Sequence, residues 1–202
     1  MSAIVVFLCG LATGLVTWIA VNGAARAEKI DPGRVPFAIL IFGAAVGTIA
    51  ARGQATADGL SLAATIAGVT SCAIGDARTG YLFDRATIGL SFVLIGLAAS
   101  NGHVLSALSS GAIVAAPLAV LFVLTRGAGI GLGDVKLAVP IGIGLGSVGG
   151  LSALGIAFVS GAVIGIVLLA RGRSRSNVVR FGPFLAVGTA ASALTPIAAV
   201  IR

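Results

Sequence analysis

Charged residues are scarce in this chain, since only 9% of its 202 residues are Asp, Glu, Lys or Arg and 58% are hydrophobic. A soluble domain usually carries about 25% charged residues. With a mean hydropathy of +1.15, the chain has more apolar surface than a water-soluble fold could bury, so lipid is the expected solvent for most of it. The composition excludes an ordinary soluble domain and favours one compact membrane domain over residues 1–202.

Cysteine and histidine are also scarce. Cys9 and Cys72 are the only cysteines, both lie within apolar runs, and His103 is the only histidine. Without a C-x-x-C pair the sequence offers no zinc ribbon and no disulfide framework, so we expect two small buried thiols. It also lacks a Walker loop, a dinucleotide fingerprint and an H-E-x-x-H motif, and we expect no cofactor and no metal.

The net charge of +7 does not indicate a nucleic-acid partner. The basic residues are spread over short loops between apolar runs, and no basic face with interleaved aromatic residues is present. Membrane topology and contact with anionic lipid explain the charge better. The lipid bilayer is therefore an expected partner, and the sequence leaves the oligomeric state open.

Long apolar runs dominate the sequence instead. They predict an all-α, polytopic bundle of about eight transmembrane helices, because unpaired strand edges are excluded from hydrocarbon. The runs are Ile4–Val21, Val35–Ala51, Leu60–Ile74, Thr87–Ala99, Val104–Leu124, Val135–Leu145, Leu151–Ala170 and Phe181–Ile201. Between Val135 and Ala170 the apolar stretch is too long for one span, and the glycines from Gly144 to Gly150 offer a turn that divides it.

The distribution of basic residues supports this division. With the N-terminus outside, eleven Lys and Arg fall on the cytoplasmic side and two on the other. The eleven are Arg26, Lys29, Arg34, Arg78, Arg85, Arg126, Lys136, Arg171, Arg173, Arg175 and Arg180, and the two are Arg52 and Arg202. Without the turn, the last four of the eleven change sides and the bias disappears. We therefore expect eight helices with both termini outside, and we expect Trp18 near a membrane interface.

Two of the six carboxylates stand out as candidates for chemistry. Glu28, Asp31 and Asp58 are interpreted as loop or helix-cap charges. Asp76 directly follows the third apolar run and Asp134 directly precedes the sixth, so the topology places both at cytoplasmic helix ends. Two carboxylates at one depth can share a proton, so that one acts as a base on water and the other as an acid toward a carbonyl oxygen. This is the chemistry of aspartic proteases, in which the pair titrates as a unit.

The residues around Asp134 allow more than one interpretation. Gly131 and Gly133 would let the backbone bend and let an extended peptide approach the carboxylate. An ordinary loop with Asp134 as the helix N-cap is an alternative. Lys136 could pair with a carboxylate, bind lipid phosphate or serve as a positive-inside anchor. Asp84 could help to form the site, although we favour a role as the cap of the following helix.

Three segments together match a known family pattern. Asp76–Asp84 (DARTGYLFD) is similar to D-x5-[IL]-P-[DN], Gly131–Leu137 (GLGDVKL) to GxGDxKL, and Phe181–Leu185 (FGPFL) to F-G-P-F-L. Their order and spacing resemble the type IV prepilin peptidases, the A24 class of GxGD membrane aspartyl peptidases. The resemblance covers residues 60–202.

The resemblance implies functions for particular residues. Asp76 and Asp134 would be the catalytic pair, Gly131 and Gly133 would shape the site, and Lys136 would be the motif lysine. The chain would then be an endopeptidase that cleaves the basic leader peptides of prepilin-like precursors, its protein substrates, at the cytoplasmic face of the bacterial inner membrane. No metal would be needed.

Two departures from the family pattern matter. Phe83 stands where the family usually has proline. Longer members carry a cytoplasmic insertion with two C-x-x-C zinc pairs and many N-methylate the product, whereas the first cytoplasmic loop here has about 13 residues and no cysteine. The chain resembles the short form found with tight-adherence pilus systems, and N-methyltransferase activity is not expected. Alternatives from other classes are a small proton-coupled transporter that uses the same carboxylates and an inactive scaffold homologue.

Overall fold

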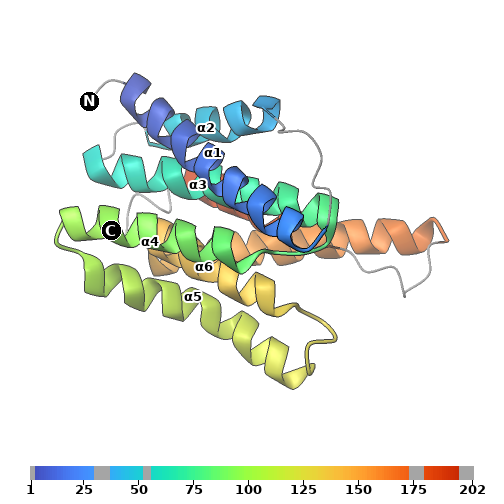
Figure 1. Ribbon diagram of the computed structural model, residues 1–202. Helices are drawn as coiled ribbons and strands as arrows, with labels where there is room; N and C mark the ends of the chain where they lie inside the picture. Colours follow the sequence, from blue (N-terminus) through green and yellow to red (C-terminus); the bar gives the residue numbers. More distant parts are fainter. Residues whose placement is uncertain (1–2, 30–36, 52–55, 173–179, 196–202) are drawn as a thin grey trace.

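The computed structural model describes residues 3–29, 37–51, 56–172 and 180–195. Within these ranges the regular secondary structure is helical throughout. The helices are α1 (Ala3–Ala27), α2 (Phe37–Ala50), α3 (Thr56–Thr79), α4 (Asp84–Ser100), α5 (Val104–Leu124), α6 (Leu132–Ala170) and α7 (Gly182–Leu194). They run in alternating directions and form a bundle (Figure 1). The predicted all-α helix bundle is confirmed.

Helix α6 consists of two helical segments joined at Gly146. This residue has φ 75° and ψ 173°, outside the helical region, and glycine adopts a positive φ without steric cost. A Cβ on Gly150 would lie only 3.3 Å from the Cα of Gly142, so the chain turns back on itself here. Figure 1 shows the second segment running back and extending past the ends of the other helices. The turn predicted among these glycines is present, which gives eight helical segments in the described residues.

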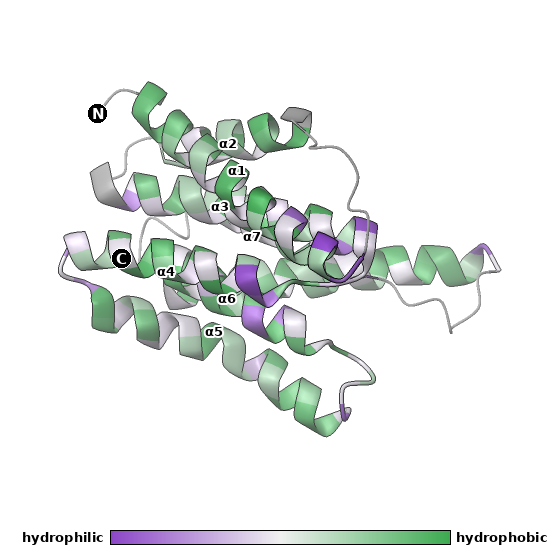
Figure 2. Cartoon of the chain, in the orientation of Figure 1, coloured by the Kyte–Doolittle hydropathy of each residue, from purple (hydrophilic) through white to green (hydrophobic). Residues whose placement is uncertain are grey.

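The helices have the length and surface that a bilayer requires. Four segments are long and apolar enough to cross a membrane, namely α1, Asp58–Thr79 of α3, α5 and α6, and shorter apolar helices occupy Ile39–Ile49 and α7. Large apolar side chains also face outward, including Phe92, Leu105 and Val123, which are each more than two-thirds exposed. Figure 2 shows that most residues along the helices are hydrophobic. An apolar exterior of this extent suits contact with lipid.

Several helices extend beyond the apolar runs that predicted them. Helix α3 continues past Ile74 to Thr79, so that Asp76 and Arg78 lie in its last turns. Helix α6 begins at Leu132, so that Asp134 lies in its first turn. Polar residues can continue a helix into the interface because the backbone groups are satisfied within the helix. The two aspartates are therefore held on regular helical backbone rather than in loops.

Charged side chains gather at one end of the bundle (Figure 2). All eight Lys and Arg residues of the described ranges lie at or beyond this end: Arg26, Lys29, Arg78, Arg85, Arg126, Lys136, Arg171 and Arg180. The other residues used in the topology prediction, Arg34, Arg52, Arg173, Arg175 and Arg202, lie outside the described residues, as does Asp31. The end that carries the cations is also the end of α3 and α6 that carries Asp76 and Asp134.

Trp18, which is expected near a membrane interface, faces the core of the bundle rather than lipid. This side chain is fully buried in the core, and the guanidinium of Arg78 lies 5.5 Å from the centre of its ring. A cation placed over an indole ring is attracted by the ring's negative face. Trp18 therefore joins α1 to the charged end of α3.

Candidate active site

Asp76 is held by the start of another helix. Its carboxyl group is buried, with 7% of the residue exposed, and Oδ2 accepts a hydrogen bond of 3.0 Å from the backbone N–H of Gly182. The first N–H groups of a helix have no partner within the helix and point toward an incoming anion. Gly182 is the first residue of α7, so this contact joins positions that are 106 residues apart.

Asp134 lies in the first turn of α6 and is similarly buried, with 8% exposed. Its Oδ2 accepts a hydrogen bond of 3.2 Å from the backbone N–H of Gly131, which is the N-cap of the helix. A carboxylate in the first turn that reaches back to the N-cap N–H is the acidic half of a capping box. The alternative with Asp134 itself as the N-cap is therefore wrong.

The two aspartates lie at the same end of the bundle, in the last turns of α3 and the first turn of α6. The charge of Asp76 acts on Asp134. Arg180 also acts on the charge of Asp76, and it is held nearby because its guanidinium donates to the carbonyl oxygen of Ala77 and lies against Gly80. Two neighbouring carboxylates of which only one has an adjacent cation can hold different protonation states. In the described residues no cluster of three His, Cys, Asp or Glu side chains is placed to hold a metal ion.

Gly133, of the two glycines before Asp134, has a steric role in the packing of the helices. Gly131 has an extended backbone with φ −76° and ψ 151°, and neither it nor Gly133 has a positive φ. A Cβ on Gly133 would lie 2.7 Å from the Cβ of Leu82, a distance shorter than packed atoms tolerate. Gly133 therefore lets the segment before α4 pack directly on the start of α6.

Lys136 pairs with Asp84 across the starts of two helices. Its Nζ lies 2.7 Å from each carboxylate oxygen of Asp84. Asp84 is the first residue of α4, whose N-cap is Phe83 and whose cap has no side-chain hydrogen bond. The favoured prediction that Asp84 caps α4 is wrong, because its carboxylate is engaged by the lysine instead.

Phe83 preserves the local backbone despite replacing the proline of the family pattern. Its φ of −77° and ψ of 126° lie within the range that proline adopts. The side chain is buried, with 6% exposed, and belongs to the core. The substitution therefore keeps the turn between α3 and α4 and adds apolar packing beneath it.

Arg180 and Gly182 were not assigned a role from the sequence. The available signal was the Phe181–Leu185 segment, which matched the family pattern but gave no partner. In the structure, Pro183 lies at the start of α7, where its missing N–H costs nothing. A Cβ on Gly182 would lie 2.6 Å from Oδ2 of Asp76, so only glycine lets the helix start come this close to the carboxylate.

Comparisons with known proteins agree with the sequence patterns. The model of the type IV leader peptidase family matches residues 63–166, a range that contains Asp76, Asp84, Asp134 and Lys136. Two proteins named "Prepilin leader peptidase/N-methyltransferase", from Burkholderia pseudomallei strains 1026b and K96243, are each 35% identical over 189 residues. These matches cover 88% of this chain and 60% of each relative, so the chain spans about three-fifths of their length. No solved structure matches the chain.

Proposed function

Because this chain belongs to the type IV leader peptidase family, we propose that it is a membrane-embedded aspartyl endopeptidase that removes the leader peptides of prepilin-like precursors. The observation that supports the proposal is that Asp76 and Asp134 are both buried at the charged end of the bundle and that the charge of one acts on the other. The two residues come from helices that are separated by more than fifty positions in the chain. Such convergence supports a shared chemical task.

In the proposed reaction Asp76 is the ionised base and Asp134 the protonated acid. The N–H of Gly182 and the charge of Arg180 stabilise a negative Asp76, whereas Asp134 faces that negative charge. Asp76 accepts a proton from a water molecule while the oxygen of that water attacks the scissile carbonyl carbon. Asp134 protonates the carbonyl oxygen. The tetrahedral intermediate then returns the hydroxyl proton to Asp134, the C–N bond breaks, and the leaving nitrogen takes the proton from Asp76.

We place this site at the cytoplasmic face of the bacterial inner membrane. All Lys and Arg in the described ranges are at or beyond the end of the bundle that carries the site, and positively charged loops remain in the cytoplasm. The substrate must present an extended backbone there, because the carbonyl groups of a helix are shielded by their own hydrogen bonds.

Mass spectrometry of a precursor's N-terminus tests the proposed activity. We expect that co-expression of this chain with a candidate prepilin yields a product cut after a glycine and just before the apolar segment. The new N-terminus should carry no methyl group, since the first loop lacks the cysteine pairs of the longer form. The precursor expressed alone is the control. A precursor that stays intact beside a correctly inserted chain would contradict the proposal for that substrate class.

The Lys136–Asp84 pair is predicted to position Asp134 rather than to stabilise the fold. The two side chains are 37% and 55% exposed, and exposed pairs contribute about 0.2–1 kcal/mol. However, the pair fixes the start of α6, two residues from Asp134, against the start of α4. We expect Lys136→Met and Asp84→Asn each to lower kcat/KM by about tenfold with little change in Tm.

A double-mutant cycle checks this prediction. If the two residues act as one unit, the double variant should be no worse than either single variant. Exchanging the residues, with Asp84→Lys and Lys136→Asp together, should restore part of the activity. Additive losses in the double variant would show that the residues act separately.

A further inference from the structure

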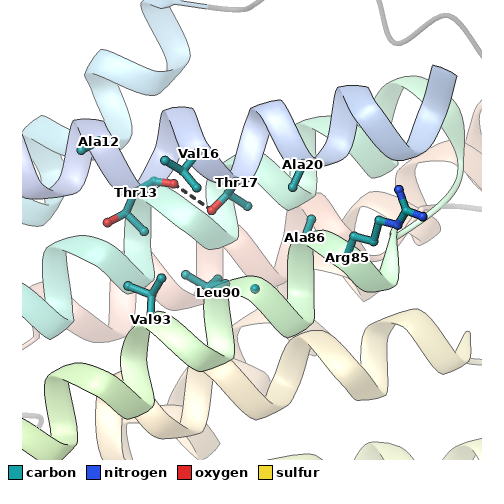
Figure 3. Close-up of a pocket in the computed structure, with 10 residues that line it drawn as sticks. Ala12, Thr13, Val16, Thr17, Ala20, Arg85, Ala86, Leu90 and Val93 are labelled. Atoms are coloured by element: carbon teal, nitrogen blue, oxygen red, sulfur yellow. Dashed lines mark hydrogen bonds between the residues drawn. The ribbon is translucent and has the colours of Figure 1, made fainter. Parts of the chain in front are cut away.

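A groove between α1 and α4 takes no part in the proposed reaction. It has a volume of about 210 Å³. Its walls include Thr13, Val16 and Thr17 from α1 and Arg85, Gly89 and Val93 from α4 (Figure 3). Along α4 it extends from Arg85 to Val93, which corresponds to a helix rise of about 12 Å.

The walls of this groove offer no available polar group along most of its length. The Thr13 hydroxyl donates to the carbonyl oxygen of Cys9 at 2.9 Å, and the Thr17 hydroxyl donates to that of Thr13 at 2.8 Å. Both hydroxyls are thus used within their own helix. A polar solute would lose its hydrogen bonds to water without replacement, so the occupant must be apolar where it lies between the helices.

One end of the groove is cationic. Arg85 borders the groove at the charged end of the bundle, and Figure 3 shows its guanidinium extending away from the apolar walls. Basic residues at the cytoplasmic ends of transmembrane helices attract anionic lipid headgroups. A matching ligand is therefore apolar over its length and negatively charged at one end.

We propose that the groove binds an anionic phospholipid, with one acyl chain between α1 and α4 and its phosphate at Arg85. A single cation at one end of an otherwise apolar groove favours a phospholipid over a partner helix. The groove is also open beside Gly89, where an added Cβ would meet no atom within 4 Å.

Fluorescence quenching of Trp18 can test this site in the full chain. Trp18 is the only tryptophan, follows Thr17 directly and is itself fully buried. Its neighbour Ile19 is exposed, so lipid outside the bundle contributes a background of quenching, and a lipid in the groove adds to it. The probe is phosphatidylglycerol or phosphatidylcholine brominated in the acyl chain, added to bilayer discs of phosphatidylcholine. We expect about a fivefold preference for phosphatidylglycerol, as attraction to one cation near the membrane surface predicts.

Three variants locate the binding site. Arg85→Gln should abolish the preference for phosphatidylglycerol. Gly89→Leu should fill the groove and lower quenching by both lipids to the background from lipid outside the bundle. Gly96→Leu is the matched control. A Cβ on Gly96 of α4 also meets nothing within 4 Å, but Gly96 does not line the groove. Trp18 in this variant should be quenched as strongly as in the wild type. The emission maximum without brominated lipid verifies that the surroundings of Trp18 are unchanged.

Several outcomes would overturn the proposal. Equal quenching by the two lipids in the wild type would remove the role of charge. Quenching that Gly89→Leu does not reduce would place the lipid elsewhere. Quenching that disappears as the protein-to-lipid ratio rises would assign the groove to a second copy of the chain. None of these measurements involves peptide cleavage, so their result is independent of the proposed function.

Discussion

Asp134→Asn is expected to lower cleavage of a prepilin by at least about a thousandfold, and Asp76→Asn by a similar factor. An amide cannot exchange a proton with water or with the scissile carbonyl group. The amide oxygen of Asn at position 134 can still accept the hydrogen bond from Gly131, and that of Asn at position 76 the one from Gly182. Each takes the place of the carboxylate Oδ2 that accepts the bond in the wild type. The variants should therefore insert into the membrane and show the same Tm as the wild type, while their kcat is much lower.

The control for these variants is a carboxylate at the same end of the bundle. Glu28 follows α1 and is exposed, and Glu28→Gln should cleave at the wild-type rate. The double variant of Asp76 and Asp134 should be no worse than either single one, because residues that act as a unit have non-additive effects. Full cleavage by both single variants would exclude the aspartyl mechanism. It would also direct attention to the transporter and scaffold alternatives.

The number and approximate positions of the helices could be predicted because each step depends on local composition. Hydropathy indicates the spans, and the glycines around Gly146 indicate the turn within α6, where the structure has its positive φ. The helix ends were placed less well, because α3 continues through Asp76 and Arg78 to Thr79. Charged residues end an apolar run, but they do not end a helix whose backbone groups remain paired.

The partners of individual side chains could not be predicted. Asp76 and Asp134 could be selected because carboxylates are rare in this chain, but the contact between Asp76 and Gly182 spans 106 positions. A composition pattern does not specify which helices are neighbours. The same limit explains the error at Asp84, which pairs with Lys136. It also explains why the burial of Trp18 beneath Arg78 was not foreseen.

Gly182→Ala is expected to lower kcat by about a hundredfold without unfolding the protein. The added Cβ would lie 2.6 Å from Oδ2, 3.0 Å from Cβ and 3.1 Å from Cγ of Asp76. Gly182 has no positive φ, so alanine fits the backbone, and the three atoms nearest to the added Cβ all belong to the aspartate. Asp76 must rotate away and lose its hydrogen bond to the helix start. Displacement of a reacting group by about 1 Å can cost this factor.

Two other glycines separate this effect from a general loss of packing. A Cβ on Gly155 meets nothing within 4 Å, so Gly155→Ala should leave both Tm and kcat unchanged. A Cβ on Gly188 of α7 would overlap the backbone carbonyl oxygen of Ala153. Because backbone cannot rotate away as a carboxylate can, Gly188→Ala should lower Tm by pushing α7 from α6.

The division between kcat and KM shows whether Gly182 acts through Asp76. If the alanine only displaces the carboxylate, kcat falls and KM stays nearly constant, because substrate binding is untouched. In an Asp76→Asn background, Gly182→Ala should cause no further loss of activity, since the group that it displaces no longer transfers protons. A further loss in that background, or a wild-type kcat for Gly182→Ala alone, would mean that the start of α7 does not position the base.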